Sequence, residues 1–374
     1  MPPLARRNLF HDRIRLAVTL TGIVFAIVLI VVQLGLFIGF SSTTSNLIDN
    51  SDADLWIGSH KVPYIEQGAP FSERKLYTVL ATPGVAQAEK FIARFAPWQS
   101  PDGRREGSLI VGFNPYGTLG RPWNIVEGRV EDLQSADTVF VDELYRKKLG
   151  VWRVGDIAEI NGYRLRVAGF TRGIRSFTTS PYIFASFKNA QNYANIAVDQ
   201  TTYILVRAVP GTDLEELRRR LSERVADVDV YTTAEFSRKT RFYWMFTTGA
   251  GIAVLLAAML GLVVGVVVVT QTIYATTMDH LREFGTLKAM GASNRYIYRI
   301  IIQQALISAV LGYALGMVVS LFVVRASREG GAAILLPASL AAGLFALTVA
   351  MCIGAAMVSI NKVTRIDPAM VFKG

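Results

Sequence analysis

Four long stretches of this sequence contain no charged residue. They run from Leu16 to Phe40, Phe246 to Thr270, Ile300 to Val324 and Leu335 to Ile360, and each is 25 or 26 residues long. A helix needs about 20 apolar residues to cross the roughly 30 Å hydrocarbon core of a bilayer. Core helices of soluble proteins rarely stay uncharged over such a length, so the sequence predicts four membrane-spanning helices.

Composition supports a membrane protein and excludes several other classes. Hydrophobic residues make up 51% of the chain and charged residues 18%, below the roughly 25% charged residues of a typical soluble protein. The single cysteine, Cys352, excludes a disulfide framework and a cysteine-based zinc site. The first apolar stretch exceeds the roughly 7–15 residues of a signal-peptide core, and no A-x-A cleavage pattern follows it, so it is predicted to be a retained anchor.

The positive charge of the chain lies mainly beside the apolar stretches. The net charge of +10 by itself suggests a nucleic-acid partner. Residues 41–245, however, hold 26 basic and 24 acidic side chains, and the rest of the chain holds 13 basic and 5 acidic ones. A net charge of +2 on the large segment is too small to support nucleic-acid binding, so no such partner is predicted. Basic residues concentrate on the cytoplasmic side of membrane helices, which places both termini and residues 271–299 in the cytoplasm.

These rules divide the chain into nine segments of a protein of the bacterial inner membrane. The predicted order is a cytoplasmic amphipathic segment 1–15, span 16–40, periplasmic domain 41–245, span 246–270, cytoplasmic loop 271–299, span 300–324, short periplasmic loop 325–334, span 335–360 and cytoplasmic tail 361–374.

Residues 41–245 are predicted to fold as an α+β domain. A strand at 54–57, a helix at 72–80 capped by Ser72, and an extended run at 85–95 form one unit. A second unit has a strand at 202–206, a helix opened by a capping box of Thr212 and Glu215, and a strand at 228–231. Two such units predict a ferredoxin-like lobe. The region 100–190 between them is rich in turn signals such as Asn161-Gly162, which predict an all-β insertion.

The domain offers little catalytic chemistry. It lacks the H-E-x-x-H and G-x-S-x-G patterns. Asp52 and Asp54 could begin a calcium site, but further oxygen ligands at calcium-loop spacing are missing, so a solvated strand start is favoured. The run Arg218–Arg220 could bind phosphate, but glutamates three and four residues away favour a solvated helix face. The sequence therefore predicts no catalytic residue and no metal ligand.

The loop 271–299 is predicted to contain a short amphipathic helix at 276–290. Its apolar side chains recur at every third position, and charged side chains lie beside them. The apolar set is Met278, Leu281, Phe284, Leu287 and Met290, and the charged set is Arg282, Glu283 and Lys288. Gly291 is placed to end this helix and Ser293 to cap the next one. The pattern suits a pocket on a cytoplasmic partner and equally suits the lipid interface.

A twelve-residue segment of this loop resembles a family motif. It reads Arg282-Glu283-Phe284-Gly285-Thr286-Leu287-Lys288-Ala289-Met290-Gly291-Ala292-Ser293 and is similar to the R-E-[IF]-G-x-L-K-A-[LM]-G-A-S segment of FtsX/MacB-type ABC transporter permeases. Within that superfamily the chain looks like the DevC group. The runs that carry this closer resemblance are Leu4–Leu9, Ile301–Ser308 and Arg365–Phe372, together with the plan of one span, a large external domain and three further spans.

The resemblance implies that 276–290 is a coupling helix that docks on an ATPase subunit. Leu281, Phe284 and Leu287 would then enter a pocket of the ATPase, and Arg282, Glu283 and Lys288 would pair at its rim. The implied coupling site also includes Met278, Gly285 and Gly291. The chain has no G-x-x-x-x-G-K-[ST] loop to hold phosphates, so no cofactor is expected in it, and ATP and Mg²⁺ are expected on a separate ATPase.

The resemblance also implies the remaining partners and the mechanism. Permeases of this family pair as two copies with two ATPases and contact membrane lipids. DevC-type permeases work with a periplasmic membrane-fusion adaptor and a TolC-like outer-membrane channel, and they export glycolipid or other amphiphilic cargo. ATP-driven closure of the dimer moves the spans and hence the external domains, a mechanism called mechanotransmission. The permease itself is non-catalytic.

Small residues in the spans are arranged for close helix contacts. G-x-x-x-G pairs occur in the first three spans, where they permit close approach of two backbones. They are Gly35 with Gly39, Gly261 with Gly265, and Gly312 with Gly316. The pattern predicts helix contacts but does not tell which of them lie within one chain and which join two chains.

Three other functions compete with export. A lipoprotein-release permease shares the plan of the spans and a related connector. An FtsX-like protein regulates cell-wall hydrolases through its external domain and exports nothing. An intramembrane protease needs catalytic groups within the spans, where the sequence offers only single serines such as Ser308 and Ser320. The resemblance of segment 282–293 and of the runs at both chain ends favours the DevC-type exporter.

Overall fold

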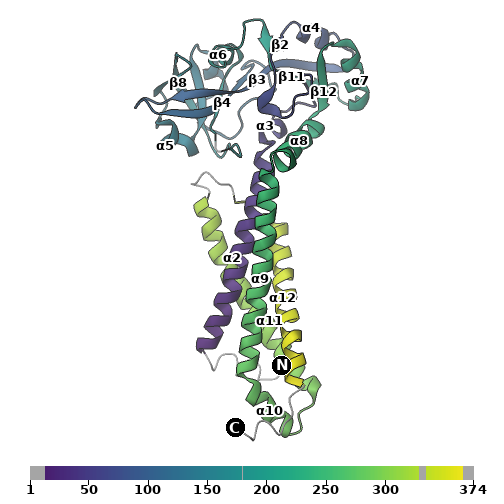
Figure 1. Cartoon of the computed structure of the whole chain (residues 1–374). Helices are drawn as coiled ribbons and strands as arrows, with labels where there is room; N and C mark the ends of the chain where they lie inside the picture. The colour runs from purple at the N-terminus through teal and green to yellow at the C-terminus, as the bar shows by residue number, and fades with distance from the viewer. Residues whose placement is uncertain (1–12, 179, 328–333, 365–374) are drawn as a thin grey trace. The chain divides into compact units, whose positions relative to one another are not determined.

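The computed structural model describes residues 13–178, 180–327 and 334–364 (Figure 1). The chain divides into two compact units: a helical unit, made of residues up to 39 and from 252 onward, and a globular unit of residues 40–251. Some predicted features lie outside the described residues. They are the segment 1–12, the runs Leu4–Leu9 and Arg365–Phe372, most of the loop 325–334, and the side chains of Leu281 and Arg282.

In the part of the chain that the structure describes, four helices are long and apolar enough to cross a membrane. They are α2 (Arg13–Thr43), α9 (Ala250–Asp279), α11 (Asn294–Ser327) and α12 (Ala338–Thr364). Their ends differ from the predicted spans because an α-helix continues through polar residues wherever backbone hydrogen bonds persist. The part of the predicted connector helix at 276–279 thus belongs to α9, and a separate helix α10 (Leu281–Ala289) follows it.

The buried face of α2 forms part of the core of the helical unit. Its buried side chains, Ile23, Ala26, Ile27, Ile30 and Val31, recur at the three- and four-residue spacing of one helix face. α9 runs alongside α2 within this unit (Figure 1). The remaining core residues come mainly from α11 and α12, with Val269 and Ile273 from α9.

The globular unit is built on one mixed sheet of ten strands. Its order is β12-β1-β11-β3-β4-β9-β6-β8-β5, and β7 pairs with both β3 and β8. The strands are β1 (Leu55–Ser59), β3 (Val85–Gln99), β4 (Arg105–Phe113), β5 (Ile125–Glu127), β6 (Thr138–Asp142), β7 (Ile157–Ile160), β8 (Tyr163–Thr171), β9 (Tyr182–Ser186), β11 (Tyr203–Ala208) and β12 (Val228–Thr232). A separate pair joins β2 (Phe71–Ser72) to β10 (Gln200–Thr201).

The predicted ferredoxin-like lobe is present. Its four strands follow the spatial order β12-β1-β11-β3, with every neighbouring pair antiparallel, and this is the split βαβ arrangement. Helices α4 (Lys75–Leu80) and α7 (Leu214–Arg224) share a core with the strands, formed by side chains such as Val79, Leu217 and Ile204. A second core contains Trp56 and Phe236, and it includes side chains of α3 (Asn46–Asp49) and α8 (Thr233–Phe242).

The insertion differs from the all-β prediction. It contains helices α5 (Arg146–Leu149) and α6 (Phe187–Tyr193) and the short 3-10 helices η2 (Val130–Gln134) and η3 (Glu143–Tyr145). A further 3-10 helix, η1 (Ile65–Gln67), lies after β1. Such short helices lack the two or three turns of periodicity that a sequence pattern needs. The long strand β3 pairs with β11 over its first half and with β4 over its second, so the insertion lobe continues the sheet of the first lobe.

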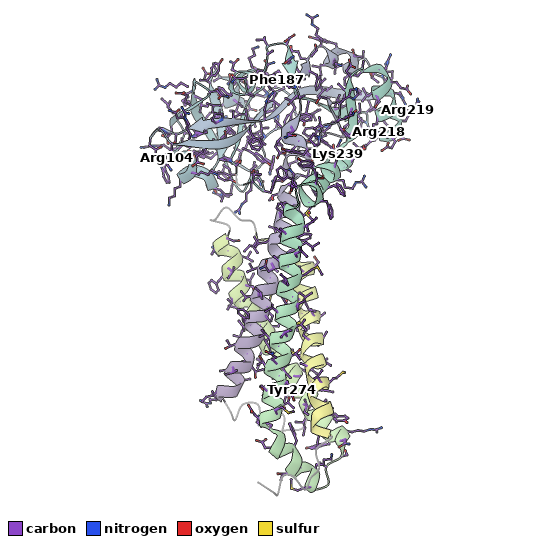
Figure 2. The ribbon with its side chains drawn as sticks, viewed as in Figure 1. Arg104, Phe187, Arg218, Arg219, Lys239 and Tyr274 are labelled. Atoms are coloured by element: carbon purple, nitrogen blue, oxygen red, sulfur yellow. The ribbon has the colours of Figure 1, made fainter. Side chains whose placement is uncertain are left out.

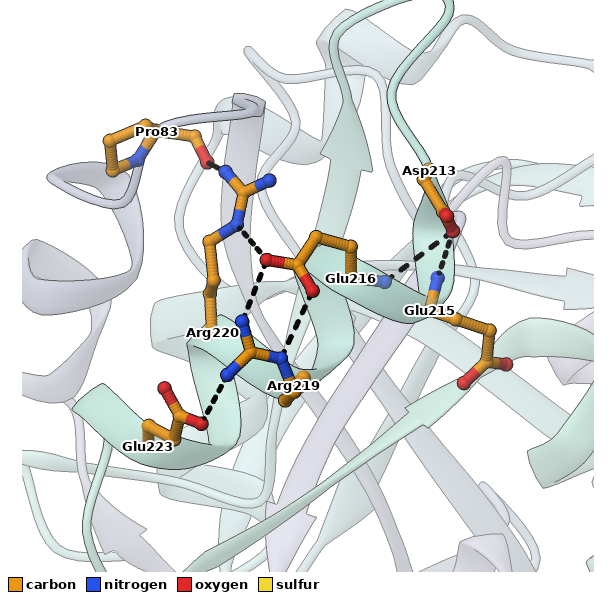
Figure 3. Close-up of polar contacts among 7 residues, drawn as sticks. All are labelled: Pro83, Asp213, Glu215, Glu216, Arg219, Arg220 and Glu223. Carbon is orange, nitrogen blue, oxygen red and sulfur yellow. Dashed lines mark hydrogen bonds and ion pairs between the residues drawn. The ribbon is translucent and has the colours of Figure 1, made fainter.

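The helix α7 begins one residue later than predicted, and its cap is different. The N-cap residue is Asp213 and not the predicted Thr212. The Asp213 carboxylate accepts hydrogen bonds from the backbone N–H groups of Glu215 and Glu216 (Figure 3). Asp213 is stereochemically suited to this role because its short carboxylate reaches the first free N–H groups. Ser72 likewise caps no helix, since it lies in β2 and α4 begins at Lys75.

The arginines of α7 form the solvated face that the sequence favours. Arg219 lies 2.8 Å from Glu216 and 2.6 Å from Glu223, and Arg220 lies 3.1 Å from Glu216 (Figure 3). Hydrogen bonds from Arg219 and Arg220 lower the pKa of Glu216 to about 2. Arg218 and Arg219 project from the surface of the globular unit (Figure 2). Because their charges are balanced within the helix, this run is not an unpaired basic patch for phosphate.

Candidate functional site

Helix α10 ends in a well-defined stop that Gly291 makes possible. The Gly291 N–H donates to the Lys288 carbonyl and the Ala292 N–H to the Leu287 carbonyl, each at 3.0 Å. This is the double hydrogen bond of a Schellman motif, which needs a left-handed residue after the helix. Gly291 has a φ of +91°, a conformation that costs glycine little. The chain therefore turns sharply into α11, at the N-cap position of which Ser293 lies.

The start of α10 is set by His280, which the sequence did not single out. His280 is the N-cap residue, and its carbonyl accepts a hydrogen bond from the Phe284 N–H at 3.1 Å. Its imidazole is buried, lies 3.0 Å from the Glu283 carboxylate through Nδ1, and meets the Phe284 ring edge-on. His280 thus lies at the junction of α9 and α10 and contacts the first turn of α10.

Phe284 lies inside the helical unit. Its exposed fraction is 1%, and it belongs to the same apolar core as Ile273 of α9, Ile297 of α11 and Ala356 of α12. The expectation that Phe284 enters a pocket on a partner therefore does not hold in this structure. The apolar stripe of α10 is used to attach the helix to its own bundle, because burying a phenylalanine there removes more apolar surface from water than leaving it at an aqueous interface. Met278 and Leu287 are partly buried against this core as well.

The exposed side of α10 runs from its first turn to the residues after its C-terminal end. Met290 is 71% exposed, and Glu283, Thr286 and Ala289 are exposed on the same helix. Lys288 is half-buried and Gly285 is buried. The exposed surface continues through Ser293 to Arg295 at the start of α11. We call this surface, residues 283, 286 and 289–295, the docking turn. It presents one large apolar side chain, Met290, surrounded by small and polar groups.

A small polar cavity lies behind α10 within the helical unit. It has a volume of about 30 Å³, which is enough for about one or two water molecules. Thr19 Oγ1 and Thr276 Oγ1 lie 2.9 Å apart at its wall. Its lining consists of the polar residues Thr19, Thr276, Thr277, His280, Gln304 and Ser308 and the apolar residues Ile273, Ile301 and Ala305. Residues of α2, α9 and α11 line the cavity, together with His280 at the start of α10.

The G-x-x-x-G glycines of the second and third spans face α2 of the same chain. A Cβ on Gly261 would lie 3.0 Å from Gln33, and one on Gly265 would lie 3.0 Å from Ile30. A Cβ on Gly312 would lie 2.5 Å from Ile23, and one on Gly316 would lie 3.0 Å from Ile27. These four glycines therefore serve packing within one chain.

The glycines of the first span and of α12 behave differently. Gly35 approaches residues 334–335, and its carbonyl accepts a hydrogen bond from the Leu335 N–H at 3.1 Å. Gly39 also interacts with another residue. Gly343 and Gly354 of α12 have open space where a Cβ would stand. Only the structure separates glycines that permit a close contact from those that do not.

This difference gives a first prediction. The substitution Gly312→Ala is expected to destabilise the protein by about 1–3 kcal/mol, because the new methyl group overlaps Ile23 in a packed helix contact. Gly354→Ala is the matched control, since the same change there meets no atom within 4 Å. The thermal unfolding midpoint of each purified variant in lipid nanodiscs measures the effect. Equal midpoints for the two variants would contradict the assigned contact.

Asp54 and His60 of the globular unit have structural partners, and the described residues hold no metal-binding cluster. No group of three or more His, Cys, Asp or Glu side chains that could hold a metal is found among the described residues. The carboxylate of Asp54 accepts a hydrogen bond from the Ala208 N–H at 2.8 Å, so it closes the start of β1. His60 pairs with Asp229 at 2.8 Å at an exposed position.

Glu66 is a buried acid that sequence reasoning missed. Its exposed fraction is 6%, and its Oε2 has no hydrogen-bond partner among the described residues. Burial raises the pKa of this carboxyl to about 7. Its electrostatic neighbours are the phenols of Tyr64, Tyr182 and Tyr203. A single glutamate between Ile65 and Gln67 carries no periodic signal that could have identified it.

Comparison with known proteins matches nearly the whole chain. The MacB-like periplasmic core domain family matches residues 16–224, and the FtsX-like permease C-terminal family matches residues 255–368. An uncharacterised ABC transporter permease of Mycobacterium tuberculosis is 25% identical, with 99% of each chain covered. One from Mycobacterium bovis is 23% identical over 97% of this chain and 96% of its own length. Among solved structures, the periplasmic region of MacB from Actinobacillus actinomycetemcomitans aligns with a TM-score of 0.40 and 12% identity, covering 52% of this chain and 96% of that one.

Proposed function

The chain belongs to the FtsX/MacB-like family of ABC transporter permeases, and from that premise we propose that it is the permease subunit of a DevC-type tripartite exporter. In this proposal two copies pair with two separate ATPase subunits, which bind ATP and Mg²⁺. The globular unit lies in the periplasm and engages a membrane-fusion adaptor below a TolC-like channel. ATP-driven motion of the helices moves the globular units and exports a lipid, glycolipid or other amphiphile.

The observation that carries the proposal is the docking turn. α10 is fixed at one end by His280 and at the other by Gly291, while Phe284 attaches its inner side to the bundle. A helix attached in this way, with one protruding apolar side chain, is suited to transmit force from a partner. Displacing it also displaces the membrane-spanning helices to which it is attached. We assign Met290 as the side chain that enters the ATPase, with Glu283 and Arg295 near its edge.

The orientation rests on charge. The basic residues outside the globular unit lie mainly at both chain ends and in 271–299, which supports a cytoplasmic position for the docking turn and for both termini. The ATPase of an ABC system is cytoplasmic, so the docking turn and its partner lie on the same side of the membrane in this arrangement.

Co-purification of the ATPase tests the assignment. Met290→Asp is expected to reduce recovery of the ATPase with the tagged permease about tenfold or more, because burial of a methionine contributes about 1.5–3 kcal/mol and each 1.4 kcal/mol is a factor of ten. Met290→Leu is expected to retain the ATPase, since it keeps the apolar volume.

Val198→Asp is the matched control for this test, because Val198 is similarly exposed but lies in the globular unit. Full recovery of the ATPase with Met290→Asp would rule out the docking turn. The same preparations separate the alternatives: recovery of an adaptor supports export, and recovery of a wall hydrolase supports an FtsX-like regulator.

A further inference from the structure

Five aromatic rings of the globular unit form a continuous series of contacts. Phe40, in the last turn of α2, meets Phe177 edge-on with ring centres 5.3 Å apart. Phe177 lies 4.2 Å from Trp244, and Trp244 lies 5.0 Å from Tyr64. Tyr64 stacks on Tyr243 at 4.5 Å. We call these five residues the ring series.

The ring series joins segments that are far apart in the sequence. Phe40 marks the point where the chain enters the globular unit from α2, and Tyr243 and Trp244 lie just before the chain leaves it into α9. Phe177 comes from the loop between β8 and β9 of the insertion lobe, and Tyr64 precedes η1. The insertion lobe therefore inserts one side chain between the two membrane-connected segments.

The backbone beside Trp244 is a break in the helix that leads to α9. Residues 243–247 form a π-helical turn, η4, between α8 and α9. Gly249 follows with a φ of +74° and open space around its Cα. π-Turns and left-handed glycines both interrupt the regular α-helical hydrogen bonds. The backbone at this point is poorly suited to transmit bending by itself, so the side chains around it gain importance.

The loop that carries Phe177 is firmly attached to the insertion lobe. The Asp142 carboxylate, 1% exposed, accepts hydrogen bonds from the N–H groups of Leu144 at 3.0 Å and Ile174 at 2.7 Å and from the Thr171 hydroxyl at 2.9 Å. Ser176 Oγ accepts from the Ser180 N–H at 3.0 Å. A loop held on both sides of Phe177 transmits displacement of that ring to the lobe.

Trp244 lies at the centre of the ring series. Its indole Nε1 is buried and has no hydrogen-bond partner among the described residues, and its ring contacts Phe177, Tyr64 and Tyr243. Aromatic pairs favour edge-on or offset geometry, which gives each pair a preferred orientation. Removal of Phe177 removes the ring contacts of the insertion lobe with both segments at once, while the pairing of β3 with β11 and β4 remains.

We propose that the ring series is the mechanical link that makes the insertion lobe follow the end of α2 and the segment 243–247 that precedes α9, with Phe177 as its central positioning residue. This inference rests on the proposed function, because a link of this kind has a role only if the helices move. In a permease that does not move its globular unit, the ring series would be packing alone.

The first experiment examines the link without nucleotide. Nitroxide labels are placed on Arg105→Cys and Thr247→Cys, both exposed, in full-length permease in nanodiscs diluted with unlabelled chain. The native Cys352 is buried and stays unlabelled. Double electron–electron resonance is expected to give a narrow distance distribution for the otherwise unaltered protein and for Phe177→Tyr. The narrow distribution is expected to be lost in Phe177→Ala and in Trp244→Ala, whereas Trp152→Ala, an exposed ring outside the series, keeps it.

The second experiment adds the ATPase and ATP. Labels on Arg105→Cys of the two copies are expected to show an ATP-dependent distance shift, which Phe177→Ala abolishes while ATP hydrolysis by the complex continues. A wild-type shift in Phe177→Ala, or an unchanged distribution in the first experiment, overturns the link. If the unaltered complex shows no shift with ATP, the proposed function fails, and the nucleotide-free distributions still decide whether the ring series holds the lobe.

Discussion

Replacing Phe284 by alanine is expected to destabilise the permease in the absence of any ATPase. The ring is 1% exposed within a core formed by α9, α11 and α12, and removal of a buried phenylalanine costs about 3–5 kcal/mol. The thermal unfolding midpoint of the helical unit, measured on the isolated permease in nanodiscs, is therefore expected to fall well below that of the unaltered protein.

Met290→Ala is the control for this prediction. Met290 belongs to the same helix but is 71% exposed, so its truncation is expected to leave the midpoint almost unchanged and to weaken ATPase recovery instead. The two variants thus separate attachment of α10 from docking. A Phe284→Ala permease that keeps its midpoint but no longer retains the ATPase would show that Phe284 faces the partner after all.

The stability of the globular unit is expected to fall as the pH rises from about 4.5 to about 7, and Glu66→Gln is expected to remove much of this dependence. Burial raises the pKa of Glu66 from 4.5 to about 7. Between these values the folded state holds a proton that the unfolded state has lost, so raising the pH favours unfolding. The shift corresponds to about 3 kcal/mol, which is present at low pH and lost above the folded pKa.

Scanning calorimetry of the full-length protein at pH 5 and pH 8 measures this effect. A change of about 3 kcal/mol corresponds to a midpoint shift of roughly 6–12 °C for a domain of this size. Glu66→Gln is expected to raise the midpoint at pH 8 relative to the unaltered protein and to leave it similar near pH 5. Glu131→Gln, at an exposed position, is the control. If the midpoint of Glu66→Gln varies with pH as that of the unaltered protein does, Glu66 is not the source of the pH dependence.

The loop 271–299 shows what a sequence pattern can predict and what it cannot. The three-residue spacing of Phe284 and Leu287 shows that α10 has an apolar side, and Gly291 shows where the helix stops. Neither observation tells which surface covers the apolar side. A partner's pocket, a lipid interface and the bundle of the same chain all remove apolar area from water. The contacts with α9, α11 and α12 resolve this for Phe284, and they leave Met290 as the exposed apolar group.

Local signals were also incomplete at the start of helices. Asp213 and Thr212 are both good capping residues, and the choice between them depends on the backbone angles that the preceding strand β11 and its turn impose. The strand–helix–strand order of the ferredoxin-like lobe was predictable because it repeats within the sequence. The helices α5 and α6 were not, since each is shorter than the window over which periodicity is visible.

The sequence by itself determined the number of long apolar helices, the presence of an α+β domain between the first two, and the family-like connector. These depend on composition and on short-range spacing, which are written along the chain. The tertiary structure alone decided that Gly261 and Gly312 face α2 of the same chain, that Phe284 points inward, and that Glu66 is buried among tyrosines. Each of these depends on contacts between segments that are distant in sequence. The free energy of such a contact depends on the surface that the fold places against the side chain, and no local sequence pattern specifies that surface.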